Sequence, residues 1–119
     1  MSRQQLIASC GVVAAVIVAA VSVAAADNSP HRVVVRGFAF EQQSLEVKVG
    51  DRVEWLNEDI APHTATALSG EWDTGALTKS QSAVISFETP GTFAYRCAYH
   101  PQMRATIVVT ETEVDGAAR

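Results

Sequence analysis

The sequence predicts an all-β fold, a Greek-key β-sandwich or barrel of about seven or eight short strands. Three observations support this prediction. Apolar and polar residues alternate with a period of two along most of the chain after residue 30, which is typical of half-buried strands. Glycine and proline turn signals separate these stretches, and none of the stretches carries a convincing helical period. Short strands of this kind indicate a sandwich or a partly closed barrel.

The alternating stretches give the expected strands in order. The first covers residues 31–40, which are rich in valine and phenylalanine, and the second covers residues 45–49. Gly50-Asp51 follows as a turn, so residues 53–56 are expected to form a hairpin with the second strand. Further strands are expected over residues 63–68, 83–87, 92–97 and 106–110.

The first residues of the chain have the pattern of a secretory signal peptide, which would form a helix ahead of the sandwich. Arg3 supplies a positive start, residues 6–26 carry no charge, and the run ends in three alanines suited to signal peptidase. The alternative is an uncleaved anchor, because the apolar run could just span a bilayer. We therefore expect a signal peptide, residues 1–26, and one domain, residues 27–119, that is periplasmic or otherwise exported.

The composition argues against nucleic acid as a partner and leaves a single cysteine, Cys97, in the expected domain. The formal net charge is −4, which disfavours nucleic acid because phosphate binding needs a basic surface. Beyond residue 26, Cys97 is the one cysteine of the sequence. Exported domains usually spend cysteines in pairs on disulfides. Cys97 is therefore expected to be either a metal ligand or an inert buried thiol.

A short loop between the last two expected strands carries most of the candidate chemistry. Cys97, His100 and Met103 offer a thiolate, an imidazole and a thioether in one segment. Taken singly, a methionine or cysteine is more often core packing than a ligand. Together they indicate a metal site, because the sole cysteine and sole methionine of the expected domain flank a histidine. His63 could supply a second imidazole if both loops lie at the same end of the sandwich.

The donor types select among metals. Zinc accepts histidine and cysteine, but structural zinc prefers four strong ligands and a thioether is a poor one. An iron–sulfur cluster would need more thiolates, and a c-type haem would need a C-x-x-C-H motif, which this sequence lacks. Copper accepts two histidines and a cysteine with a weak axial methionine, so copper is the expected metal.

On these residues the sequence resembles the cupredoxins, the family of type 1 (blue) copper proteins. The similar pieces lie between residues 38 and 109 and are Asp51–Asn57, Ala61–Thr64, Gly91–Cys97 and the ligand loop. The two residues between His100 and Met103, beginning with Pro101, are similar to amicyanin-like members, whereas plastocyanin-like members have longer spacings. The resemblance implies one copper ion with His63, Cys97 and His100 as equatorial ligands and Met103 as the axial ligand.

Two neighbours of the ligands also have counterparts in the family. Asn57 matches an asparagine that braces the first ligand loop. Thr64 stands where amicyanin-like sequences commonly carry an asparagine that ties the two ligand loops together. Because a hydroxyl can also make such a bridge, we expect the tie to persist through Thr64.

The resemblance implies a carrier of single electrons between redox partners through Cu(II)/Cu(I), most simply a monomer. Four protein donors leave no clearly open position for a substrate, which argues against an enzyme with catalytic residues. The expected partner is a dehydrogenase, cytochrome or oxidase that docks on a small apolar patch around His100, with Ala61, Pro62, Ala98 and Pro101. Membrane contact is expected only if the signal segment stays uncleaved. The alternative function, with the same ligands, is copper storage or delivery in the periplasm.

Overall fold

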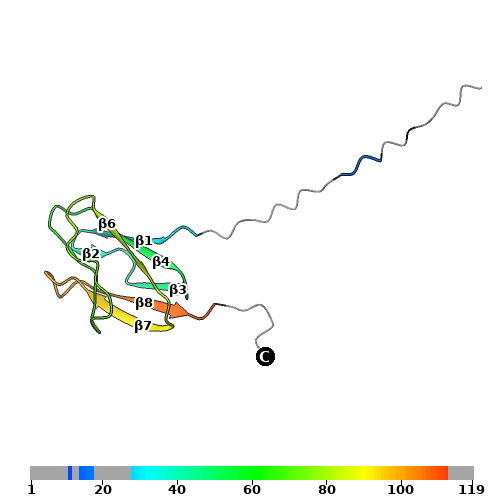
Figure 1. The fold of residues 1–119 in the computed structure, drawn as a ribbon. Helices are drawn as coiled ribbons and strands as arrows, with labels where there is room; N and C mark the ends of the chain where they lie inside the picture. Colours follow the sequence, from blue (N-terminus) through cyan, green and yellow to red (C-terminus); the bar gives the residue numbers. More distant parts are fainter. Residues whose placement is uncertain (1–10, 12–13, 18–27, 113–119) are drawn as a thin grey trace, which may run out of the picture.

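The computed structural model describes residues 11, 14–17 and 28–112, and within this part of the chain it contains eight strands and no helix (Figure 1). The predicted signal peptide lies outside the described residues, apart from Gly11 and residues 14–17, which belong to no strand or helix. Over the described ranges, no helix has the length and apolar character needed to cross a membrane.

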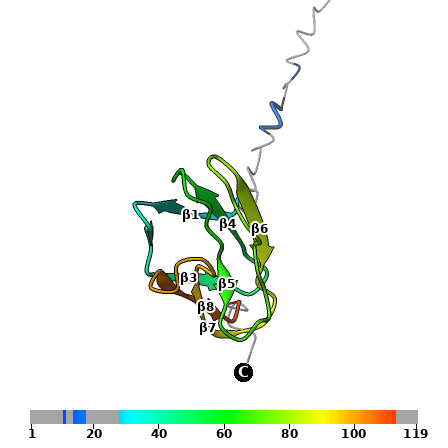
Figure 2. The ribbon, with the colours of Figure 1, turned by 90° about the vertical axis from the view of Figure 1, so that its left-hand side faces the viewer.

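The strands form two four-stranded sheets, which confirms the predicted all-β sandwich. The first sheet has the order β2 (Ala39–Phe40), β1 (His31–Arg36), β4 (Arg52–Asn57), β6 (Ser82–Ser86). The second has the order β3 (Ser44–Lys48), β8 (Arg104–Thr110), β7 (Gly91–Arg96), β5 (Thr66–Ala67). The pairs β1–β4 and β3–β8 are parallel, and the other pairs are antiparallel. Figure 2 shows the two sheets from one end.

The core lies between the sheets and is built from the inward residues of the alternating stretches. Val33, Val53, Trp55, Tyr95 and Ile107 are fully buried. Trp55 of the first sheet donates its indole N–H to the Tyr95 hydroxyl of the second at 3.3 Å, and their ring centroids lie 5.5 Å apart. Burial raises the pKa of Tyr95 to about 12, so the phenol stays neutral. This aromatic pair therefore joins the two sheets across the core.

One expected strand, residues 31–40, is interrupted in the structure. The chain turns at Gly37 and Phe38, whose φ angles are +62° and +57°, and β2 folds back antiparallel to β1. Positive φ at both central residues is the requirement of a tight type I′ hairpin turn. Apolar residues lie on both sides of Gly37, three valines before it and two phenylalanines after it, so residue type alone does not reveal the break that this glycine marks.

The expected hairpin between residues 45–49 and 53–56 is wrong. The strands belong to different sheets, since β3 pairs with β8 and β4 pairs with β1 and β6. Gly50 has a φ of +92° and donates its backbone N–H to the carbonyl of Phe87 at 2.8 Å. The turn therefore leads the chain from β3 in the second sheet to β4 in the first. Each strand thereby turns its own apolar side toward the shared core. The expected strand at 63–68 is likewise reduced to Thr66–Ala67.

Three connections gather at one end of the sandwich. These are the β1–β2 turn, the loop that follows β4 and the loop between β7 and β8 (Figure 1). The start of β1 and the end of β8 lie at the opposite end. The topology therefore meets the condition on which the sequence prediction of His63 rested.

At the opposite end, Asp51 anchors the β3–β4 turn. Its carboxylate accepts the backbone N–H of Lys48 at 2.9 Å, and the same oxygen lies 2.9 Å from Nε2 of His31. The bond from Lys48 is the main reason that the pKa of Asp51 lies below its ordinary value; burial opposes this shift and His31 assists it.

We expect Asp51→Asn to be less stable than the wild type at neutral pH, by on the order of 0.5 kcal/mol. Because the folded pKa is depressed, the ionised carboxylate stabilises the fold above the unfolded pKa of about 3.9. That contribution is lost as the pH falls through the folded pKa, so the difference should shrink below about pH 4. Urea unfolding of both full chains in metal-free buffer measures it. An equal difference at neutral and acidic pH would contradict this role.

Candidate metal centre

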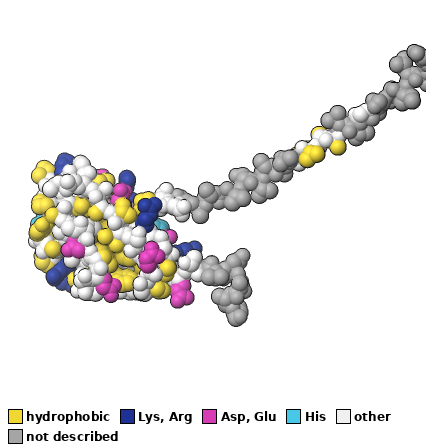
Figure 3. Space-filling model, in the orientation of Figure 1, with side chains coloured by type: hydrophobic (Ala, Val, Ile, Leu, Met, Phe, Trp, Pro, Cys, Tyr) yellow, Lys and Arg dark blue, Asp and Glu magenta, His cyan; other side chains and the backbone are white. Residues whose placement is uncertain are grey.

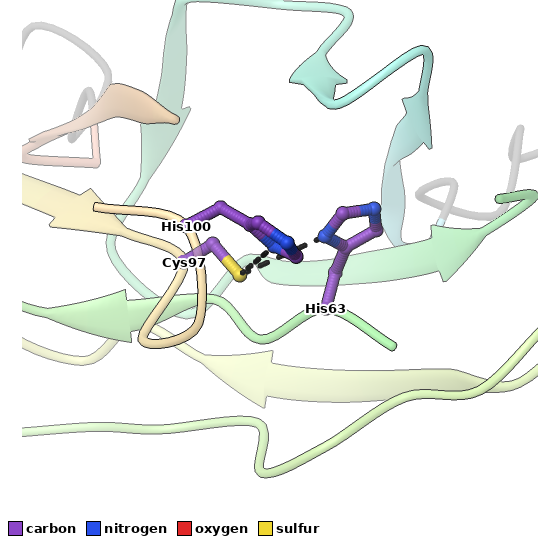
Figure 4. Close-up of side chains that lie close together, drawn as sticks. All are labelled: His63, Cys97 and His100. Atoms are coloured by element: carbon purple, nitrogen blue, oxygen red, sulfur yellow. Dashed lines mark hydrogen bonds between the residues drawn. The ribbon is translucent and has the colours of Figure 1, made fainter. Parts of the chain in front are cut away.

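The structure brings three of the predicted donors together at the end where the loops gather. The Sγ atom of Cys97 lies 3.7 Å from Nδ1 of His63 and 3.7 Å from Nδ1 of His100 (Figure 4). One ligand atom from each of the three residues lies within 4.8 Å of the others. His63 and Cys97 are fully buried, whereas His100 is partly exposed. Residues far apart in the sequence thus place two imidazole nitrogens and one sulfur around a single point.

Backbone hydrogen bonds hold both ligand segments. Cys97 follows β7 directly; its N–H donates to the carbonyl of Met103 at 3.1 Å, and the Met103 N–H donates to the carbonyl of His100 at 2.9 Å. On the other segment, His63 and Leu77 exchange two backbone hydrogen bonds of 3.0 and 2.8 Å. Backbone hydrogen bonds therefore fix the conformation of both segments that carry the donors.

Met103, the predicted axial ligand, lies at the base of the same loop. Its side chain is buried, with 3 % exposure, and belongs to the hydrophobic core cluster that also contains Cys97. This burial and the backbone bonds above place Met103 in the site region, while its role as a ligand is taken up as a proposal below.

Asn57 braces the loop before His63, as the sequence predicted. The side chain is fully buried and donates to the carbonyls of Ala61 at 2.9 Å and Leu77 at 2.7 Å. Its Oδ1 atom accepts the backbone N–H of Asp59 at 2.8 Å. The bonds to Ala61 and Asp59 close the loop after β4, and the bond to Leu77 joins it to the segment that pairs with His63, so Asn57 fixes the path of the chain that leads to His63.

Thr64 makes the predicted tie between the two ligand segments. Its hydroxyl accepts the backbone N–H of Ala98 at 2.8 Å, and its own N–H donates to the Cys97 sulfur at 3.4 Å. Thr66 donates its single hydroxyl hydrogen to the Asp73 carboxylate at 3.0 Å. It must therefore accept from Thr64, 2.8 Å away, and this leaves the Thr64 lone pairs for Ala98.

Asp59 is a functional residue that the sequence reasoning missed. Its carboxylate lies 2.8 Å from Nε2 of His63 and also accepts the backbone N–H groups of Gly37 at 2.8 Å and Phe38 at 2.9 Å. Burial disfavours the charged form, but these three donors outweigh it and hold the pKa of Asp59 below its ordinary value. An ionised carboxylate only accepts, so His63 carries its proton on Nε2 and presents the Nδ1 lone pair to Cys97.

An acid four residues before the histidine is the one sequence feature that could have pointed to Asp59. Carboxylate partners of this kind orient ligand histidines in metal proteins. The donor chemistry at the centre of the site consists of two imidazole nitrogens and one buried thiol, with the nearest carboxylate bonded to the far side of the His63 ring. This set fits copper better than a hard cation, which would need oxygen ligands.

Comparison with known proteins identifies the same family that the sequence resembles. The family model of the cupredoxin-like domain matches residues 8–109. Amicyanin of Paracoccus denitrificans is 37% identical over 75 residues, an alignment that covers 59% of this chain and 57% of the relative. The matched part is thus less than two thirds of that relative's length.

Solved structures give the same result. An amicyanin variant in its Cu(I) form is similar with a TM-score of 0.62 and 31% identity, covering 68% of this chain and 82% of the amicyanin chain. A copper-containing nitrite reductase from Thermus scotoductus SA-01 is similar with a TM-score of 0.66 and 30% identity, but only 23% of the enzyme chain is covered. The likeness to an enzyme is therefore confined to a minor part of that enzyme.

We expect Thr64→Val to destabilise the fold by about 1–3 kcal/mol, because it leaves the backbone N–H of Ala98 without its acceptor. Thr64→Ser keeps the hydroxyl and is the matched control, expected to lose far less. Urea unfolding of the three full chains in metal-free buffer measures the difference. If the valine variant were as stable as the serine variant, the tie between the loops would contribute nothing.

Proposed function

We propose that this chain, which belongs to the cupredoxin-like domain family, is an exported type 1 copper protein that carries single electrons between redox partners in the periplasm. His63, Cys97 and His100 would be the equatorial ligands of one copper ion and Met103 the axial ligand. The observation that carries the proposal is the convergence of the three donor atoms at one end of the sandwich. Bound copper would supply a one-electron Cu(II)/Cu(I) couple.

The surroundings of the donors suit electron transfer because they resist rearrangement. Asp59 fixes the ring of His63. Thr64, the next residue, is tied to the loop of Cys97, and Asn57 fixes the chain that leads to His63. A ligand set held in one geometry by a rigid sandwich changes little between two oxidation states. This is the property that a fast one-electron carrier needs.

A carrier is favoured over an enzyme by the closed donor set. Two imidazoles, a thiolate and a thioether would fill the coordination sphere from the protein side, and catalytic metal sites keep a position open for water or substrate. The amicyanin relatives support the same conclusion. We assign no catalytic residue to this chain.

The partner is proposed to dock over His100, where the structure exposes apolar side chains. The predicted patch consists of Ala61, Pro62, Ala98 and Pro101. Three larger apolar side chains at the same end of the sandwich are also exposed: Phe38 by 50 %, Ile60 by 85 % and Tyr99 by 54 %. Apolar side chains are seen along the edge of Figure 3 that corresponds to the loop end of Figure 1. A small apolar surface beside a partly exposed ligand suits a short-lived encounter with a dehydrogenase, cytochrome or oxidase.

Loading the full chain with Cu(II) is expected to give an intense blue absorption from thiolate-to-copper charge transfer. Cys97→Ser should abolish the colour because it removes the sulfur donor. His31→Gln changes a histidine at the far end of the sandwich and should leave the spectrum unchanged. A colourless wild type would rule out the type 1 assignment.

Electron exchange with a small cytochrome c, followed by stopped flow, tests the carrier function. We expect Ile60→Lys to slow exchange on the order of tenfold with an unchanged visible spectrum, because a charge would enter the apolar docking surface. Val84→Lys on β6, 45 % exposed in the wild type, is the control and should exchange normally. A blue wild type that exchanges no electrons but yields its copper readily to a chelator would instead support storage or delivery.

A further inference from the structure

The Gly37–Phe38 turn between β1 and β2 contains an unusual residue. Phe38 has a φ of +57°, in the left-handed region that bulky side chains rarely enter, and half of its surface is exposed. Such a conformation persists only where the surroundings impose it, and it is a reason to look for a function. Ser80 is the one other non-glycine residue with positive φ in the described part of the chain.

The turn is imposed by the carboxylate that also orients His63. Asp59 accepts the N–H of Gly37 through Oδ1 and the N–H of Phe38 through Oδ2, and Oδ2 also receives the His63 Nε2–H. The side chain of Asp59 is 13 % exposed; its bond to His63 is partly buried, and its bonds to Gly37 and Phe38 lie at the surface. The position of Phe38 is therefore coupled to that of a proposed copper ligand.

The ring of Phe38 contacts both proposed imidazole ligands. Its centroid lies 5.1 Å from that of His63 and 4.9 Å from that of His100, with interplanar angles of 88° and 89°. The two imidazoles lie 5.0 Å from each other. Edge-to-face contacts at these separations are the favoured geometry for aromatic rings. The three rings thus form a cluster in which the phenyl ring touches both imidazoles.

The two imidazoles differ in how they are held. His63 has the carboxylate of Asp59 on Nε2 and is fully buried. His100 is partly exposed, and among the described residues its ring contacts are the Cys97 sulfur, Phe38 and the His63 ring, with no hydrogen-bond partner on Nε2. Of the two imidazoles, His100 is thus the one whose outer nitrogen has no hydrogen bond among the described residues, and the Phe38 ring packs against it.

From this we infer that Phe38 is a positioning residue of the metal centre, which restrains the His100 ring and slows loss of the metal. The inference rests on the proposed function, because it takes His100 as a ligand. The strained turn serves to present the ring, and Asp59 couples both imidazoles to one anchor. A merely exposed turn residue, or one used only for partner docking, would leave metal retention unaffected.

Copper removal by an excess of a Cu(I) chelator, from the full chain loaded with Cu(I) under reducing conditions, tests this role. Phe38→Leu keeps an apolar side chain at the same φ but removes the ring, and it should speed release roughly tenfold, the size expected for loss of aromatic contacts. Phe38→Tyr keeps the ring and should release copper at the wild-type rate. Equal rates in the leucine variant and the wild type would overturn the inference while leaving the copper assignment intact.

A measurement on the metal-free wild type tests the same contact without copper or any substitution. Proton NMR should show nuclear Overhauser effects from the Phe38 ring to the ring protons of His100 and His63. Their absence would overturn the inference. If the chain bound no copper, the proposed function would fail, and this experiment would still decide whether the Phe38 ring contacts the His100 ring.

Discussion

The loop end of this protein depends on one partly buried carboxylate, that of Asp59. Asp59 joins the β1–β2 turn to the segment that carries His63, and it does so through three hydrogen bonds of 2.8 to 2.9 Å. It fixes the tautomer of one imidazole and, through the turn, the aromatic ring that packs on both imidazoles. The carboxylate of Asp59 thereby orients both the His63 ring and the Phe38 ring, which lie on two different loops.

The two sheets of the sandwich position the segments that carry the donors. Cys97 leaves β7 in the second sheet, whereas the His63 segment follows β4 of the first sheet. The Trp55–Tyr95 contact joins those two strands across the core. The tie from Thr64 to Ala98 then closes the gap between the ligand segments. The convergence of the three donors thus depends on both core packing and polar contacts.

Much of this arrangement could be predicted from the sequence. Period-two alternation indicated the sandwich, and the spacing of Cys97, His100 and Met103 indicated a soft metal site. The partner of each strand could not be predicted, because alternation specifies which face is buried but not which strand lies alongside. Asp59 lies only four residues before His63, but its bonds to Gly37 and Phe38 cross the fold. The contact of Phe38 with His100 also joins residues far apart in the sequence, so no local pattern records it.

The central claim is that two imidazoles and one thiolate, brought together by this fold, hold a single copper ion. X-ray absorption fine structure at the copper edge of the loaded protein tests it most directly. The account predicts one copper per chain with a short sulfur contact and the multiple-scattering pattern of two imidazoles. A copper environment of nitrogen and oxygen alone, with no sulfur contact, would contradict it.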